Sequence, residues 1–386
     1  MPFELLWLLL PAAAASGWWV ARRNGRDRST GGLPGEYFRG INFLLNEQPD
    51  KAIEIFTNMV EVDSETVEPH FALGNLFRRQ GEVERAIRIH QSLMARGTLS
   101  REQRKQALFE LGQDYLQAGL FDRAENMFRE LLDRDPRHPA ARRLLIDLYE
   151  QEKEWEKAIA VGSLMDGGAG HSFKPIIANY YCELAVQALD ARNFSRMGRM
   201  IRRALFHDRY SVRASLLAAE AARAQGHYRA AIRALKRVNK QDPAYLSEAI
   251  EPLLDCYERL DRGDDAIVYL KAVLARQEAF KPVLILADYM RRRGRGREAR
   301  DYIVNYLHHY PSLPGLAYLI ESLPQDDSVG DRAPDLDIAR SSLNSLLSNV
   351  QSYHCVNCSY GGTVMRWQCP GCRSWNSIKP HQGRAT

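Results

Sequence analysis

The sequence contains few cysteines, and most of them are clustered in one segment. Six cysteines occur among 386 residues. Cys182 and Cys256 stand alone inside helical patterns, whereas the other four fall within eighteen residues near the C-terminus. A secreted disulfide framework distributes its cysteines through the fold, so this pattern favours a reducing compartment. The two isolated thiols are expected to be small buried hydrophobic residues.

A large excess of one charge is lacking as well. Lys and Arg number 53 against 48 Asp and Glu, which leaves a net charge of +5. This mild excess is compatible with an anionic membrane surface or an acidic partner, but it is too weak to indicate nucleic acid. At 386 residues the chain exceeds one compact core, so we expect two or more structural units.

Motifs that mark common enzymes are absent too. The sequence contains no H-E-x-x-H, no G-x-S-x-G and no Walker-type phosphate loop. We therefore expect a protein that works by binding and is not an enzyme.

The N-terminus supplies a long apolar run from Phe3 to Val20, in which Glu4 is the only charge. As a helix these residues would span about 27 Å, enough to cross a hydrocarbon core. A cleavable signal peptide, the alternative, carries positive charge before its apolar stretch, but here four arginines follow it at positions 22 to 28. The positive-inside rule then keeps the rest of the chain in the cytoplasm. We expect an uncleaved single-pass transmembrane anchor at 1–21 and a basic juxtamembrane linker at 22–35.

A short pattern recurs through the middle of the chain. It consists of a glycine or polar residue, an aromatic or small residue two positions later, and usually an alanine five positions after the first. We call this last residue the anchor residue; copies recur every 33 to 39 residues and are weaker at positions 52, 197 and 266. The anchor residues are Ala52, Ala86, Ala124, Ala158, Met197, Ala231, Ala266 and Ala299. This is the period of the tetratricopeptide repeat, a pair of helices.

Other positions keep the same register. Small residues stand twelve positions before most anchor residues, where they would let the two helices of a repeat approach closely; they are Gly40, Gly74, Gly112, Ala185, Ala219 and Ala287. Prolines stand twelve positions after three anchor residues and are expected to end the second helix; they are Pro136, Pro243 and Pro311. The sequence therefore predicts an all-α fold, a superhelix of about eight tetratricopeptide repeats with a capping helix over 36–323. The concave face of such a stack typically holds an extended peptide or another protein.

Two arginine clusters stand out in this region. Arg192, Arg196, Arg199 and Arg203 follow one another at i, i+4, i+7 and i+11, which predicts one stripe along a helix. Five more arginines crowd an inter-helix turn at positions 291 to 297. A solvated face is the default interpretation of each cluster, and an acidic partner or anionic lipid headgroups are the alternative. Nucleic acid is not expected, because stacking aromatics do not interleave with these arginines.

The C-terminal cysteines form two C-x-x-C pairs. A linker and one amphipathic helix are predicted at 324–350, followed by a small domain at 351–386. The pairs are Cys355 with Cys358 and Cys369 with Cys372. Two facing turns of this kind make a tetrahedral site with four sulfurs, which suits one zinc or iron ion per chain. Paired disulfides are the alternative, which the reducing location disfavours. With no open position, the metal is expected to be structural.

This small domain resembles rubredoxin-type metal knuckles, particularly in the C-P-x-C of its second turn. It departs from them where glycine usually follows each pair, because Ser359 and Arg373 stand there. These two residues must either accept backbone strain or relax the turn. Trp367 and Trp375 flank the second pair and are expected to pack in the small domain or against the last repeat.

The whole chain resembles one family, the lipopolysaccharide assembly protein B family of Gram-negative bacteria. The residues that carry the resemblance are the opening LLWLLLPAAAASGW with Arg22-Arg23, the stretch RGINFLLNE at 39–47, and the tail W-x-C-P-G-C-R-S-W-N-S-I-K-P. The resemblance implies an inner-membrane adaptor that lowers lipopolysaccharide synthesis. It implies three partners: an FtsH-type membrane protease, the lipid A pathway deacetylase that this protease degrades, and a multi-span inner-membrane regulator that restrains the adaptor.

Two other functions remain open from the sequence. One is a redox-active iron module for electron transfer, which a reversible colour change on reduction would support. The other is a general assembly platform for envelope biosynthesis enzymes, which would bind no protease.

Overall fold

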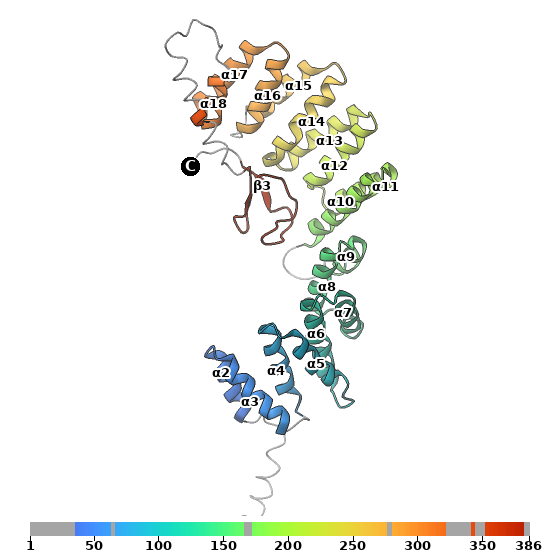
Figure 1. Ribbon diagram of the computed structural model, residues 1–386. Coiled ribbons are helices and arrows are strands. Elements are labelled where there is room, and N and C mark those ends of the chain that lie inside the picture. Colours follow the sequence, from blue (N-terminus) through green and yellow to red (C-terminus); the bar gives the residue numbers. More distant parts are fainter. Residues whose placement is uncertain are drawn as a thin grey trace, which may run out of the picture. The chain divides into compact units, whose positions relative to one another are not determined.

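In the computed structural model, the chain consists mainly of paired helices and ends in a small three-stranded sheet (Figure 1). The structure describes residues 35–62, 66–165, 172–275, 280–321, 341–343 and 352–381. By its internal contacts the chain divides into two compact units, residues 1–148 and 149–386. The fold is therefore mostly helical, and the all-α prediction needs the sheet added to it.

The first unit contains six helices within its described residues, and the division between the units falls inside α8 (Pro139–Glu152). Its helices are α2 (Gly35–Leu45), α3 (Pro49–Val62), α4 (Val67–Arg79), α5 (Val83–Met94), α6 (Arg101–Gln117) and α7 (Phe121–Arg134).

The second unit continues the same alternation of helices and adds the sheet. Its helices are α9 (Trp155–Gly162), α10 (Lys174–Asp190), α11 (Phe194–His207), α12 (Val212–Ala224), α13 (Tyr228–Gln241), the 3-10 helix η2 (Pro243–Tyr245), α14 (Leu246–Glu258), α15 (Gly263–Leu274), α16 (Phe280–Arg292), α17 (Gly296–His309) and α18 (Leu313–Glu321). Its strands are β1 (Tyr353–Cys355), β2 (Gly361–Gly362) and β3 (Ile378–Pro380).

Within the described ranges, α2 to α17 form eight successive pairs, and the turn inside each pair has a left-handed residue five positions before the anchor residue. Four of these residues are glycines, which adopt positive φ at little cost. The other four, with φ of 53° to 59°, are Glu47, Lys153, Arg192 and Asp261. In the second pair, the amide of Glu82 donates to the carbonyl of Phe77 and that of Gly81 to Arg78, which closes the end of α4. The turn conformation explains why the pattern begins with a glycine or a polar residue.

A small residue before most of the turns lets the paired helices touch. A Cβ atom on Gly112 would lie 2.6 Å from Cε1 of Phe128, which is closer than two carbon atoms approach in proteins. The same closeness joins Gly40 to Phe56, and all eight anchor residues are buried. The predicted role of these small residues is therefore confirmed.

The three prolines end helices as predicted. Helices α7, α13 and α17 stop two residues before Pro136, Pro243 and Pro311, respectively. Proline lacks the amide hydrogen that the next helical bond requires.

The predicted membrane anchor at 1–21 and most of the segment at 324–350 lie outside the described residues. Among the helices that are described, none has both the length and the apolar character needed to cross a bilayer. The anchor therefore stays a prediction from the sequence.

Candidate metal centre

A small antiparallel sheet with strand order β2-β1-β3 frames the four clustered cysteines. Strand β1 ends at Cys355, which lies opposite Ile378 of β3. Each cysteine pair then forms the same turn, because the amide of Ser359 donates to the carbonyl of Cys355 and that of Arg373 donates to Cys369. The two turns thus present their sulfurs in the same way.

Ser359 and Arg373 close these turns with a left-handed backbone. Their φ angles are 57° and 56°, respectively. The sequence leaves two outcomes open at these residues, backbone strain or a relaxed turn. The structure therefore shows backbone strain. For residues with a Cβ atom this conformation costs roughly 1–2 kcal/mol each.

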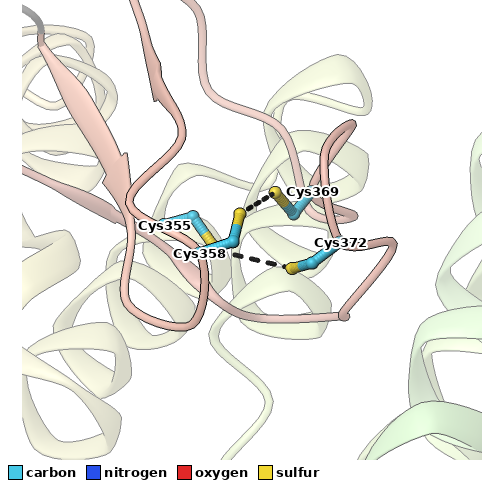
Figure 2. Close-up of side chains that lie close together, drawn as sticks. All are labelled: Cys355, Cys358, Cys369 and Cys372. Atoms are coloured by element: carbon cyan, nitrogen blue, oxygen red, sulfur yellow. Dashed lines mark hydrogen bonds between the residues drawn. The ribbon is translucent and has the colours of Figure 1, made fainter.

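The two turns face each other and bring all four sulfurs together (Figure 2). The Sγ atoms of Cys355 and Cys372 are 3.7 Å apart, those of Cys358 and Cys369 are 3.6 Å apart, and all four lie within 4.8 Å of one another. A disulfide bond is about 2.0 Å long, so these cross-turn pairs are free thiols.

The sulfur cluster has the dimensions of a tetrahedral metal site. With metal–sulfur bonds of about 2.3 Å, as for zinc, two sulfurs of a tetrahedron lie about 3.8 Å apart. The separations of 3.7 Å and 3.6 Å between the cross-turn pairs agree with that value. The four thiols therefore fit one metal ion, which would tie the two turns together.

Hydrogen bonds already favour the thiolate at Cys355. Burial raises the pKa of this thiol, but its hydrogen bonds to the Ser377 hydroxyl and to the backbone amides at 357 and 358 outweigh burial and lower the pKa to about 6. The amide of Asn357 lies 3.4 Å from the sulfur. Because metals bind thiolates, this environment suits a metal ligand.

The metal domain docks on helices of its own unit through Trp375. The indole Nε1 of Trp375 donates to Glu150 at the end of α8 at 2.8 Å, and Gln368 donates to the other carboxylate oxygen at 2.9 Å. The ring of Trp375 lies edge-on to Trp155 of α9 and Tyr180 of α10. Tyr180 also donates to Glu150, at 2.5 Å. The Glu150 carboxylate thus accepts hydrogen bonds both from the metal domain and from a repeat helix.

A second group of contacts joins the metal domain to helices in the middle of the second unit. The guanidinium of buried Arg213 lies 5.8 Å from the ring of Trp367 and 5.9 Å from that of Trp375, and it pairs with Glu183. Tyr245 stacks on Trp367 with a centroid separation of 5.4 Å, and its hydroxyl donates to the carbonyl of Ile378.

Charged and polar pairs complete the contact. The Tyr353 hydroxyl donates to Glu248 at 2.9 Å, and Lys379 pairs with Asp242. The prediction that the tryptophans pack in the small domain or against the last repeat is therefore wrong in its choice of partners. They contact helices from α8 to η2, and among their contact partners only Trp155 belongs to the recurring sequence pattern.

The two arginine clusters have different surroundings. Arg196, Arg199 and Arg203 lie exposed on α11, but Arg192 precedes that helix in the left-handed turn, so the predicted stripe is one residue shorter. In the second cluster, Arg293 pairs with Glu258 and Arg295 with Asp264 and Glu298, which makes that turn an ion-pair network.

Comparison with known protein families agrees with this geometry. Residues 70–105 and 109–170 match tetratricopeptide repeat models, and residues 353–380, which include all four clustered cysteines, match the rubredoxin metal binding domain. The chain is thus a tetratricopeptide-repeat protein that carries a rubredoxin-type metal-binding domain at its C-terminal end.

Relatives match over nearly the full length. The chain is 36% identical to the lipopolysaccharide assembly protein B of Escherichia coli strain K12 over 383 residues, covering 98% of both chains. It is 33% identical to the protein of that name from Haemophilus influenzae over 389 residues, again covering 98% of both. The chain therefore belongs to the lipopolysaccharide assembly protein B family.

Solved structures with a similar helix arrangement are more distant. One is the Naa15/Naa10 complex bound to HypK-THB, with 16% identity and a TM-score of 0.45, which covers 82% of this chain and 47% of that one. At these values the likeness carries no argument about function.

Proposed function

We propose that this protein is a non-enzymatic, membrane-anchored adaptor that regulates lipopolysaccharide assembly. The observation that carries the proposal is the match over 98% of both chains to proteins named for lipopolysaccharide assembly. A repeat body supports an adaptor, because stacked helix pairs offer extended surfaces for holding other proteins.

The proposal places the adaptor at the cytoplasmic side of the inner membrane. Its support is the apolar run from Phe3 to Val20 and the arginines that follow it. Tethering confines the repeats to the membrane surface, where it raises their effective concentration near membrane-bound partners.

In this account the adaptor joins an FtsH-type membrane protease to the lipid A pathway deacetylase. A multi-span inner-membrane regulator would restrain it. An adaptor of this kind acts by raising the local concentration of substrate at the protease, so it needs no reactive group of its own. The metal at Cys355, Cys358, Cys369 and Cys372 would hold the small domain in the shape that docks on the helices, as structural sites do.

A second candidate function is electron transfer by an iron-loaded centre. It is favoured by the exposure of Cys358 and Cys372, which leaves one side of the sulfur cluster open to solvent. A reversible absorbance change on reduction, together with loss of function when zinc replaces iron, would support it. The adaptor proposal predicts full function with zinc.

Co-purification tests the adaptor proposal. The full chain is extracted in mild detergent from cells that make it at its native level, and bound proteins are identified by mass spectrometry. We expect the protease and the deacetylase together. A chain that lacks residues 1–21 should be released from the membrane fraction by a high-salt wash and lose the protease. Recovery of other envelope biosynthesis enzymes without any protease would favour the assembly platform.

A further inference from the structure

Helices α11 and α13 present an unusually basic outer surface. Neither helix contains an acidic residue, and together they carry nine lysines and arginines. Their buried faces are formed by small and aliphatic residues such as Met197, Ile201 and Leu235. The cations are Arg196, Arg199, Arg202, Arg203, Arg229, Arg233, Lys236, Arg237 and Lys240.

This charge is specific to two neighbouring repeats. In these two repeats, the outward positions that follow the anchor residue by two, five and six residues are all cationic. They are Arg199, Arg202 and Arg203 in α11 and Arg233, Lys236 and Arg237 in α13. Each of the other six repeats has at most one cation at these positions. General solubility does not require such a concentration in one place.

Few of these cations meet an acid within the described chain. Arg196 pairs with Glu156 at 2.9 Å, whereas Arg203 lies over the ring of Tyr181 and Lys236 over that of Tyr269. The arginine cluster near position 293, in contrast, is neutralised by its ion pairs. The surface of α11 and α13 therefore keeps net positive charge available to a partner.

An exposed aromatic edge adjoins this basic surface. The side chain of Phe206, in the last turn of α11, is 86% exposed, and Tyr210 just beyond it is 58% exposed. The guanidinium of Arg209 lies 4.7 Å from the Tyr210 ring. Gln241, at the end of α13, donates to the carbonyl of Arg209 at 2.8 Å, so the ends of the two helices lie side by side.

We propose that the outer surface of α11 and α13 binds an anionic phospholipid bilayer, with Phe206 and Tyr210 inserted among the headgroups. Cations near an anionic leaflet each contribute favourably, and aromatic side chains prefer the interface between headgroups and acyl chains. An acidic protein segment would satisfy the arginines, but it gives no reason for a nearly fully exposed phenylalanine beside them. A membrane contact explains both features.

Vesicle sedimentation tests the proposal with the full chain. The protein is placed in phosphatidylcholine nanodiscs, so that its N-terminal apolar segment is already occupied. It is then mixed with vesicles of phosphatidylcholine alone or with about one-third phosphatidylglycerol. We expect sedimentation with the anionic vesicles only, weakening as salt is added, since salt screens surface charge. Equal sedimentation with both vesicles would overturn the proposal.

A triple variant and a matched control localise the contact. Replacing Arg199, Arg202 and Arg203 with glutamine should lower the apparent affinity by roughly 100-fold, at about fivefold per cation. The control, which replaces Arg259, Arg262 and Arg292 with glutamine, changes the net charge equally and should lower it by about threefold or less. Equal losses in the two variants would contradict a specific surface.

The Phe206→Ser variant separates a membrane from an acidic protein. It keeps every charge, so a purely electrostatic partner should bind it as before, whereas insertion predicts a loss of roughly tenfold. Competition by soluble polyglutamate is the complementary measurement. Unchanged vesicle binding by Phe206→Ser together with strong competition by polyglutamate would assign the surface to an acidic polypeptide.

Discussion

Several residues other than glycine have a left-handed backbone conformation in this chain. They mark the places where the backbone is most strained. Four of the seven in the described residues lie in turns between paired helices, and three lie in the metal domain at Ser359, Arg373 and Asn376. Such residues persist only where surrounding contacts hold them. At Ser359 and Arg373 the holding contacts are the turn hydrogen bonds and, in our account, the bound metal.

Glycine at these two positions should strengthen the metal domain. Ser359→Gly and Arg373→Gly relieve roughly 1–2 kcal/mol of strain each but raise the entropy of the unfolded chain, so we expect a net gain of about 0.5–1 kcal/mol per site. Metal release to a chelator should slow by about threefold per substitution. Asn357→Gly is the control, because its backbone is outside the left-handed region and glycine there should speed release. Faster release from both test variants would contradict the strain argument.

At the scale of elements, one carboxylate is a central contact in the docking of the small domain. Glu150 accepts hydrogen bonds from Trp375 and Gln368 of the metal domain and from Tyr180 of α10. Three donors thus converge on the two oxygens of one side chain. Its position near the end of α8 places it opposite the second cysteine turn.

Glu150→Ala should loosen this contact without removing the metal. Two donors of the metal domain lose their acceptor, and hydrogen bonds to charged groups contribute roughly 1.5–3 kcal/mol each. We expect amide hydrogen exchange within 353–380 to accelerate at least about tenfold while elemental analysis still finds one metal per chain. Glu154→Ala, which removes an exposed acid four residues later, should change neither quantity. Unchanged exchange in the Glu150 variant would show that the other contacts, the stacked aromatic rings with the Tyr353–Glu248 and Lys379–Asp242 pairs, hold the domain without it.

Loss of the metal should disturb more of the small domain than loss of the Glu150 contact does. Cys355→Ser removes one of four ligands, and because a structural metal supplies much of the folding energy of so small a domain, the domain should unfold and release Trp367 and Trp375 from the helices. Elemental analysis should find the metal gone, and tryptophan fluorescence should shift to longer wavelength. Cys256→Ala removes a buried thiol elsewhere and should keep both signals. Equal metal content in wild type and a variant lacking all four cysteines would refute the site.

The elements differ in how far the sequence predicts them. Repeat geometry is predictable because its contacts are local: Gly112 and Phe128, which touch where α6 and α7 cross, are sixteen residues apart. The contacts that form the two cysteine turns are local as well. Docking is different, because Trp375 and Glu150 are 225 residues apart and meet through the fit of two surfaces. No periodic pattern records such a match, which is why the partners of Trp367 and Trp375 were predicted wrongly.

At the scale of the whole molecule, each part of the chain has one physical task in our account. The apolar N-terminus fixes the protein at the membrane, the helix pairs hold other proteins, and the metal domain contacts helices from α8 to α14. None of these tasks is a chemical reaction. In this account the chain changes the rate of a process only by bringing other proteins together.

The lifetime of the lipid A pathway deacetylase tests this central claim most directly. In a pulse-chase experiment, cells depleted of the protein are compared with cells that contain it, and the decay of the deacetylase is followed beside that of an unrelated substrate of the same FtsH-type protease. The adaptor account predicts that depletion lengthens the lifetime of the deacetylase several-fold, raises lipopolysaccharide and leaves the unrelated substrate unaffected. An unchanged deacetylase lifetime, or equal slowing of both substrates, would contradict it.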